Sequence, residues 1–405
     1  MSTLTAVSGS HRRPYYWEEV TENWSAPRGQ SNANATGLPT WAEHGLRALR
    51  EGLGREPGTV PGMRYLHRVE LTDAARNAED MPRSYQAEHA ALTLFGLHQH
   101  GATKPVHHPG AGLGAACRAL REHQATAPLK TSGQRLTTVQ ERRVAVPVAR
   151  RLAAAATALD LDELVHHLRG LVPMLRQAEV GLDYTRLHRD LCDWLTPHHG
   201  RVLRAWGLQY THSPAEAAES GRNEKGVEPA FWAGFDPARP DAGAELAALR
   251  CGLGEEAGTV PAMWVCYRTT MGSELRAKGA LTRDLIAEHT ALALFGLHQQ
   301  GRQQPMHTPH LSPGTACRLL LARNKNTDRT ALERRLGVLL TSLDTGELAH
   351  HLRSLVPLLR QADVGLDYDL LRRALRNWGD PKQPEAQSRL RSAWDRDFRR
   401  TDPQT

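Results

Sequence analysis

The chain contains one segment twice. Its first occurrence, Glu163 to Tyr184, reads ELVHHLRGLVPMLRQAEVGLDY, and its second, Glu347 to Tyr368, reads ELAHHLRSLVPLLRQADVGLDY. From His166 onward, 16 of 19 residues are identical at an offset of 184 positions, which chance cannot produce. Other segments are repeated in the same order, so we expect two copies of one domain in this chain of 405 residues.

Composition favours helices in both copies. Aromatic residues make up only 5% of the chain, whereas the hydrophobic share of 40% is enough for packed cores. We therefore expect an all-α protein with two tandem copies of a compact helical-bundle domain. The boundaries that we expect are a disordered tail over 1–13, a first domain over 14–210, a flexible linker over 211–228 and a second domain over 229–400.

A second repeated segment has the pattern of a core helix. EHAALTLFGLHQHG, Glu88 to Gly101, matches EHTALALFGLHQQG, Glu288 to Gly301, at 11 of 14 positions. It is apolar on nearly all sides, which predicts a helix buried at the centre of its domain. His89 and His98 stand nine residues apart without an HExxH motif or a Cys/His quartet, so we interpret them as packed histidines and not as metal ligands.

The segment from Glu163 to Tyr184 predicts a helix with two faces. Pro173 should kink or break this helix, because proline lacks the backbone N–H and clashes with the preceding turn; Pro357 should do the same in the second copy. We expect Gly181 to end the helix and Asp183 to cap the next one. The apolar stripe consists of Leu164, Leu168, Leu171 and Leu175, repeated as Leu348, Leu352, Leu355 and Leu359.

Arginines occupy the polar faces of the repeated helices. Lys and Arg exceed Asp and Glu by 51 − 44 = 7, an excess that solvated arginines would explain by themselves, so their placement carries the prediction. Arg169 and Arg176 stand seven residues apart, about 10 Å along a helix, and could reach two phosphates of one strand. The candidate nucleic-acid-binding residues are Arg50, Arg118, Arg150, Arg151, Arg169, Arg176, Arg250, Arg318, Arg334, Arg335, Arg353 and Arg360.

Other features narrow the class of protein. The five cysteines form no CxxC pair, which is typical of reduced cysteines in a cytosolic protein. We find no run of 18 apolar residues and no signal-peptide pattern, so we expect a cytoplasmic protein without membrane contact. Gly52 and Gly54 follow a predicted helix and no strand precedes them, so we interpret this GxG as a helix end and not as a dinucleotide-binding loop.

As an ordered series, the repeated motifs resemble a known family. The series is ALR-GLG, EH-AL-LFGLH, CR-L, ERRL-LL-LD, HLR-LVPLLR, LDY-LLRRAL-NW and LR-AW-RDF. It resembles CasB, the small subunit of the type I-E CRISPR Cascade complex, over nearly all of each copy. The resemblance implies a helical, non-catalytic subunit without a cofactor, present as a pair, whose basic face holds the nucleic acid of the R-loop. This chain would be a tandem fusion of two such copies.

The resemblance also implies the partners. They are the other Cascade protein subunits, together with crRNA and target DNA, including the displaced strand; no small-molecule substrate is implied. The basic surface would consist of the arginines named above, with Arg50, Arg118, Arg250 and Arg318 as the weaker candidates. An enzyme is not supported, because neither copy shows paired carboxylates, a nucleophile with its base or a metal quartet. The alternative is a stand-alone, pseudo-symmetric DNA-binding regulator, which would need a helix-turn-helix directed at base edges.

Overall fold

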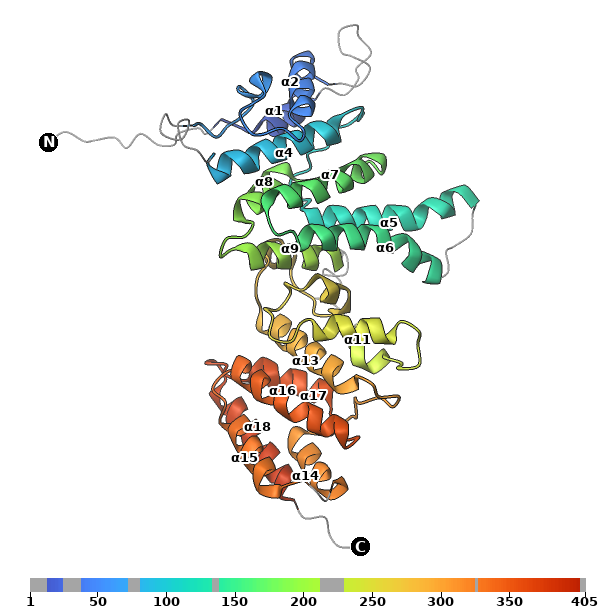
Figure 1. Ribbon diagram of the computed structural model, residues 1–405, viewed down its shortest axis with the longest axis vertical. Coiled ribbons are helices and arrows are strands. Elements are labelled where there is room, and N and C mark those ends of the chain that lie inside the picture. The colour runs from blue at the N-terminus through green and yellow to red at the C-terminus, as the bar shows by residue number, and fades with distance from the viewer. Residues whose placement is uncertain are drawn as a thin grey trace, which may run out of the picture. The chain divides into compact units, whose positions relative to one another are not determined.

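The computed structural model describes residues 13–24, 38–71, 81–132, 138–211, 229–324 and 327–400. Within these ranges the chain forms α-helices, short 3-10 helices and two isolated β-bridges, and no strand (Figure 1). The predicted all-α fold is therefore confirmed. Apart from Arg13 and Thr211, the expected tail and the expected linker lie outside the described residues.

The two copies carry matching series of helices. In the first copy these are α1 (Tyr16–Glu22), α2 (Thr40–Glu51), η1 (Pro61–Met63), α4 (Arg83–Gln99), α5 (Leu113–Ser132), α6 (Thr138–Ala156), α7 (Leu161–Gln177), α8 (Tyr184–Asp193) and α9 (His199–Thr211). In the second they are η3 (Phe231–Gly234), α11 (Ala242–Arg250), η4 (Pro261–Cys266), α12 (Ser273–Ala277), α13 (Arg283–Gln299), α14 (Pro313–Arg323), α15 (Arg329–Thr341), α16 (Thr345–Gln361), α17 (Tyr368–Asn377) and α18 (Pro384–Arg399). The chain divides into two compact units, Met1–Val202 and Leu203–Thr405, and this division falls inside α9.

The central helix of each unit is α4 or α13, as the sequence predicts. α4 packs against α2, α7 and α8, and α13 packs against α11, α16 and α17. Phe95 and Phe295 are almost fully buried on these helices, as are His98 and His298. The helices are buried on nearly every side, so each unit is assembled around one of them.

A buried tyrosine joins each central helix to the VGLDY segment, which runs from Val180 to Tyr184 in the first copy and from Val364 to Tyr368 in the second. The hydroxyl of Tyr368 lies 3.0 Å from Nδ1 of His298, and Nε2 of the same ring lies 3.0 Å from the carbonyl oxygen of Val364. Because a carbonyl only accepts, Nε2 carries the proton of the ring, and the tyrosine hydroxyl shares its own proton between Nδ1 and the carbonyl oxygen of Leu294 at 3.2 Å. Tyr184 and His98 make the equivalent contact at 3.1 Å. Burial is the main cause that lowers the pKa of both histidines to about 4, so both are neutral near pH 7.

The helices α7 and α16 differ from the prediction at two places, the proline in the middle and the C-terminal end. Both continue through Pro173 and Pro357 without a break. One missing backbone hydrogen bond is outweighed where a buried leucine stripe holds the helix on both sides of the proline. The helices end at Gln177 and Gln361, just before Glu179 and Asp363, which have φ angles of 51° and 53°.

The prediction that Gly181 ends α7 is therefore wrong. It lies beside the ring of His108, where an added Cβ would come within 2.4 Å of the ring carbon Cγ. The cap predicted for the next helix is confirmed, because the side chain of Asp183 accepts the N–H of Arg186 at 2.9 Å. This glycine thus permits close packing against the loop before α5.

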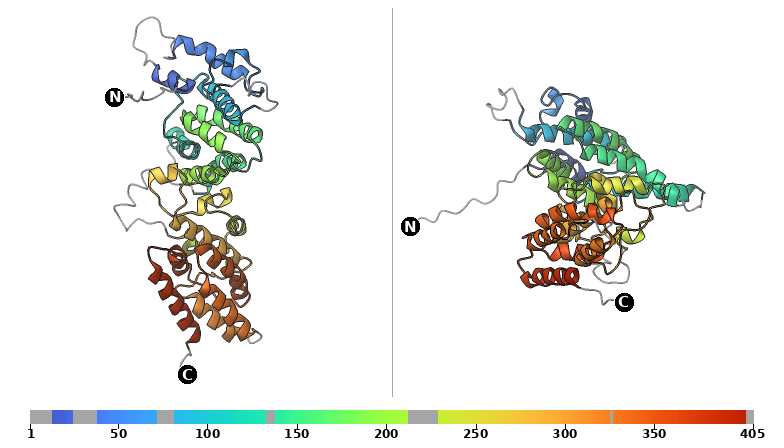
Figure 2. Two further views of the ribbon diagram at one scale, coloured as in Figure 1. Left: turned by 90° about the vertical axis from the view of Figure 1, so that its left-hand side faces the viewer. Right: turned by 60° about the horizontal axis from the view of Figure 1, so that its bottom comes forward.

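The insertion in the first copy lengthens one helical hairpin. α5 and α6 contain 20 and 19 residues, whereas α14 and α15 contain 11 and 13. Figures 1 and 2 show α5 and α6 side by side as a long hairpin. Equivalent residues are 200 positions apart before this hairpin and 184 apart after it, so the first copy has 16 extra residues here, and they extend helices that both copies possess.

A buried glutamate fixes the loop that precedes each central helix. Glu88 accepts the N–H groups of Arg68 and Val69 at 2.7 and 2.8 Å and lies 3.3 Å from Nδ1 of His67. Its counterpart Glu288 accepts the N–H groups of residues 268 and 269. Burial by itself would raise the pKa of Glu88, but the hydrogen bonds from His67 and the two N–H groups outweigh burial and hold the pKa below its ordinary value.

We expect Glu88→Gln to destabilise the first unit by about 1–3 kcal/mol at pH 7, because a buried hydrogen-bonded carboxylate is lost. The lowered pKa means that the contribution of the charge is present above the ordinary pKa of a glutamate and is lost as the pH falls towards the folded-state value. The stabilities of wild type and variant should therefore converge in acid. Hydrogen exchange of the amides of Arg68 and Val69 measures the effect, and equal protection in both proteins at pH 7 would contradict this role.

Candidate nucleic-acid interface

The candidate arginines differ in exposure. The exposed ones lie on α6 and α15 and are Arg150, Arg151, Arg334 and Arg335. The half-buried ones are Arg50, Arg169, Arg176, Arg250, Arg318, Arg353 and Arg360. Arg118 is buried, at 8% exposure, and lies 3.9 Å from Glu122. The buried position of Arg118 suits an ion pair within the fold better than a contact with phosphate.

An arginine from α6 lies across α7 in the first copy. Nη1 of Arg151 donates to the carbonyl oxygen of Gly170 at 3.3 Å. A Cβ on Gly170 would come within 2.8 Å of this nitrogen, so the glycine makes room for the guanidinium group. The second copy has Ser354 at this position, and the hydroxyl of Ser354 donates to the carbonyl of His351 instead. The first copy thus ties Arg151 to the backbone of α7.

The arginines of α7 are anchored on one side. Nη1 of Arg169 lies against the turn at Gly54, where an added Cβ would be 3.3 Å away and where φ is +79°. Seven residues on, Nη1 of Arg176 donates to the carbonyl oxygen of Leu97, near the end of α4, at 3.2 Å. Sequence spacing placed these arginines on one face, and the structure shows that the same face also contacts α4 and the turn after α2.

The second copy repeats this geometry on α16. Nη1 of Arg353 would lie 3.1 Å from a Cβ added to Gly254. Nη1 of Arg360 donates to the carbonyl oxygen of Leu297 and to Oε1 of Gln300, both at 3.0 Å. A guanidinium group that is held by one nitrogen has fewer conformations to lose when the others bind a ligand. Each unit therefore presents pre-positioned arginine side chains along the equivalent helix, α7 or α16.

His100, which is not among the residues predicted from the sequence, joins the arginines of the first copy. Partial burial lowers the pKa of this exposed side chain, and the positive charges of Arg50 and Arg176 lower the pKa further. The three side chains therefore share one neighbourhood and one sign of charge. The second copy has Gln300 at this position, so only the first copy can gain a proton here. The one sequence signal was this His/Gln difference in an otherwise repeated motif.

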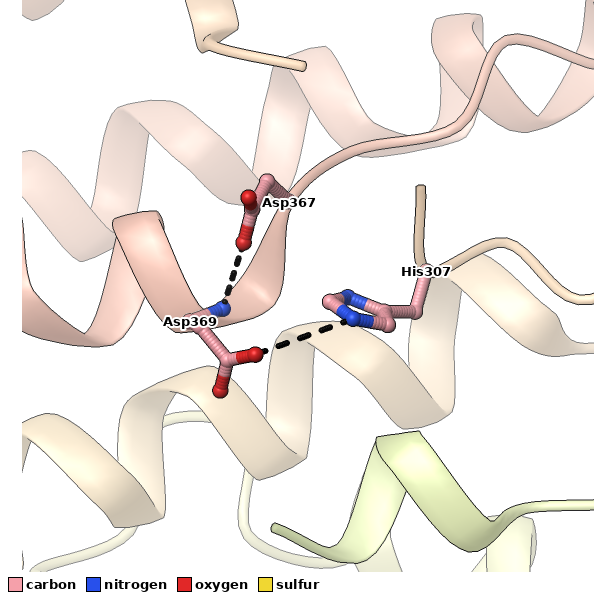
Figure 3. Close-up of side chains that lie close together, drawn as sticks. All are labelled: His307, Asp367 and Asp369. Carbon is pink, nitrogen blue, oxygen red and sulfur yellow. Dashed lines mark hydrogen bonds and ion pairs between the residues drawn. The ribbon is translucent and has the colours of Figure 1, made fainter. Parts of the chain in front are cut away.

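One cluster of the second unit has the composition of a metal site (Figure 3). Ligand atoms of His307, Asp367 and Asp369 lie within 4.8 Å of one another. However, Nδ1 of His307 accepts the N–H of Tyr368 at 3.2 Å, so Nε2 carries the proton and faces Asp369 at 3.7 Å. Asp367 is occupied by the N–H groups of His310, Asp369 and Leu370 at 2.6 to 2.9 Å. The cluster is thus a helix cap beside a contact between a neutral imidazole and a carboxylate, and its donors do not fit a metal.

The corner of the domain around His307 and Asp369 is built from different residues in the first copy. Trp232 donates its indole N–H directly to the carboxylate of Asp369 at 3.0 Å. In the first copy the indole of Trp17 donates to the hydroxyl of Thr185 at 2.8 Å, and this hydroxyl donates to Glu18 at 2.6 Å. One carboxylate serves each corner, supplied by α17 in the second copy and by α1 in the first.

Four of the five cysteines are not activated nucleophiles. All five are free. Burial raises the pKa of Cys117 and Cys317, and burial followed by nearby charges raises that of Cys192 to about 11 and that of Cys266 to about 12. These thiols therefore stay protonated and unreactive at neutral pH.

No helix in the described ranges combines the length and the apolar character that a membrane span requires. The fold and the site thus define a class: a tandem pair of helical domains whose shared feature is a set of arginines along equivalent helices.

The comparison with protein families identifies the family. The model of the CRISPR-associated protein Cse2 matches residues 46–210 and again residues 245–398. Together these matches span more than half of the chain, so the chain belongs to the Cse2 family, and the family domain occurs in it twice. The resemblance to CasB found in the sequence is confirmed. Family membership supports a subunit of the CRISPR Cascade complex, and subunits of this family are in general non-catalytic.

A solved structure similar to this chain is that of CasB from Thermobifida fusca. Its sequence is 28% identical, the match covers 42% of this chain and 90% of that chain, and the TM-score is 0.32. No curated protein matches the chain.

We expect metal ions to leave the second unit unaffected, because a proton occupies Nε2 of His307 and backbone N–H groups occupy Asp367. Neither EDTA nor an equimolar amount of Zn²⁺ should shift the thermal unfolding midpoint. Differential scanning calorimetry of wild type and His307→Gln gives the comparison. A stabilisation by Zn²⁺ that His307→Gln abolishes would show that the cluster binds metal after all.

Proposed function

We propose that this chain is the small subunit of a type I-E Cascade complex and supplies, as one fused pair, the two copies that hold the R-loop. The observation that carries the proposal is the repetition of anchored arginines on α7 and α16, flanked by exposed arginines on α6 and α15. Guanidinium groups at these positions suit phosphates of a nucleic-acid backbone.

The proposed role is to stabilise an opened duplex. Exchange of a DNA duplex for a guide–target heteroduplex is close to balanced in free energy, so protein contacts with the backbone decide whether the opened state persists. Such contacts need no base recognition. One nitrogen of Arg176 and one of Arg360 are already bonded to carbonyl oxygens, and the other nitrogens remain for contacts with backbone phosphates.

Fusion gives the pair a thermodynamic advantage. Once one copy is seated in the complex, the second copy is present at a high effective concentration and binds without a further bimolecular step. We propose that the partners are the other Cascade proteins, together with crRNA and target DNA. The subunit would thus act by binding and not by chemistry, in the cytoplasm where invading DNA is met.

The exposed arginines allow a test that spares the fold. We expect Arg151→Glu with Arg335→Glu to accelerate dissociation of target DNA from the assembled complex. The slope of log affinity against log salt should also fall by roughly 2, because two phosphate contacts are lost. Target binding at several salt concentrations measures both effects.

The matched control for this test lies on α8 and α17. Arg189 and Arg373 are exposed, occupy equivalent positions in the two copies and undergo the same change of charge when replaced with Glu. This control should retain the wild-type salt slope. Equal effects of the two double variants would reduce the result to net charge and contradict the assignment of Arg151 and Arg335.

His100 gives a pH test. A phosphate bound beside Arg50 and Arg176 would raise the lowered pKa of His100, so binding takes up a proton and affinity increases as the pH falls. We expect target affinity to rise more steeply between pH 7.5 and 6.0 for wild type than for His100→Gln, which copies the residue of the second copy. Identical pH profiles would place the bound phosphate elsewhere.

A further inference from the structure

In each copy, a leucine at the equivalent position has its side chain largely exposed to solvent. Leu159 and Leu343 are 81% and 77% exposed, more than any other large hydrophobic residue in the described part of the chain. Each immediately precedes the N-cap of its helix, Asp160 before α7 and Asp344 before α16. Isolated surface leucines are common, but these two recur at equivalent positions and are held in the same way.

The backbone holds both leucines in place by the same bonds. The N–H of Leu159 donates to Oε2 of Glu163 at 2.7 Å, and the N–H of Leu343 donates to Oε2 of Glu347 at 2.6 Å. The neighbouring residues have changed, since Ala158 corresponds to Ser342 and Leu161 to Thr345, yet the leucine and its bond are the same. Local capping therefore fixes an apolar side chain in solvent in both copies.

The residues that follow each leucine at the start of its helix are acidic, in contrast to the arginines further along the same helices; the cation nearest Leu343 is Arg391, which donates to the carbonyl of Ser342 at 2.6 Å. Asp160, Asp162 and Glu163 lie beside Leu159, and Asp344 and Glu347 lie beside Leu343. A nucleic-acid backbone would be repelled by these carboxylates. A protein surface with an apolar socket and a basic rim is complementary to such a leucine in both polarity and charge.

We propose that Leu159 and Leu343 are two equivalent protein-docking points, each inserted into an apolar socket with basic residues at its rim. Because the two points have the same structure, the partner presents this socket twice, either as two copies of one subunit or as a repeated surface. The proposal rests on the proposed function in one respect only, namely that the partner is a protein of the Cascade complex.

Leucine-to-serine variants of the full chain test the proposal. The probe is purified Cascade that lacks this chain, with its crRNA bound, and biolayer interferometry measures the binding of the chain to it. Leu159→Ser and Leu343→Ser should each weaken binding about tenfold, and the double variant should weaken it further, because one chain engages both sockets. The control is Leu281→Ser, an exposed loop leucine that also directly precedes a helix N-cap, Thr282; it should bind like wild type.

The outcomes separate this proposal from the proposed function. Binding of the double variant within twofold of wild type would overturn the docking points and leave the arginine test above untouched. Weak binding of wild type itself would instead count against the Cascade assignment. Sedimentation velocity of the free chain should show no change in oligomeric state for the double variant; a loss of self-association would overturn the proposal in favour of a second copy of the chain as the occupant.

Discussion

Each unit depends on the buried hydrogen bonds between its central helix and the VGLDY segment. His298 receives the hydroxyl of Tyr368 on one nitrogen and donates to the carbonyl of Val364 from the other. Because the ring is neutral and buried, both bonds form away from competing water, where an unmade bond would be costly. They fix the end of α16 relative to α13, and that end carries Arg360. The position of the arginines is thus a consequence of the core.

The sequence predicted the parts of the fold that are determined locally. Repetition and apolar pattern identified α4 and α13, and the cap at Asp183 was correct because a cap and the helix that it starts are neighbours in the chain. The end of α7 was wrong although it too is local. Glu179 adopts the left-handed conformation for which glycine is the usual residue, and the N–H of Val180 bonds the carbonyl of Leu175 at 2.9 Å, so the helix closes before Gly181 is reached. The spacing of Arg169 and Arg176 likewise gave no sign that both guanidinium groups contact other elements of the unit.

The two copies share their architecture and differ in the details of their surfaces. The first copy has the longer α5–α6 hairpin, a glycine that admits Arg151 against α7, and a histidine where the second has Gln300. Both retain the arginines of α7 and α16 and the leucines before those helices. The shared features suit a task that both copies perform, and the differences suit two positions that are not equivalent.

The corner beside the VGLDY segment also limits how the duplicated halves can exchange sequence. Tandem repeats in a gene recombine readily, yet the carboxylate of this corner comes from Glu18 in one half and from Asp369 in the other. Transfer of the aspartate into the first half would set two carboxylates against each other, whereas transfer of Thr185 into the second half would leave its corner without one. Gene conversion between the halves is therefore penalised here unless both helices are copied together, which helps the two halves to keep separate identities.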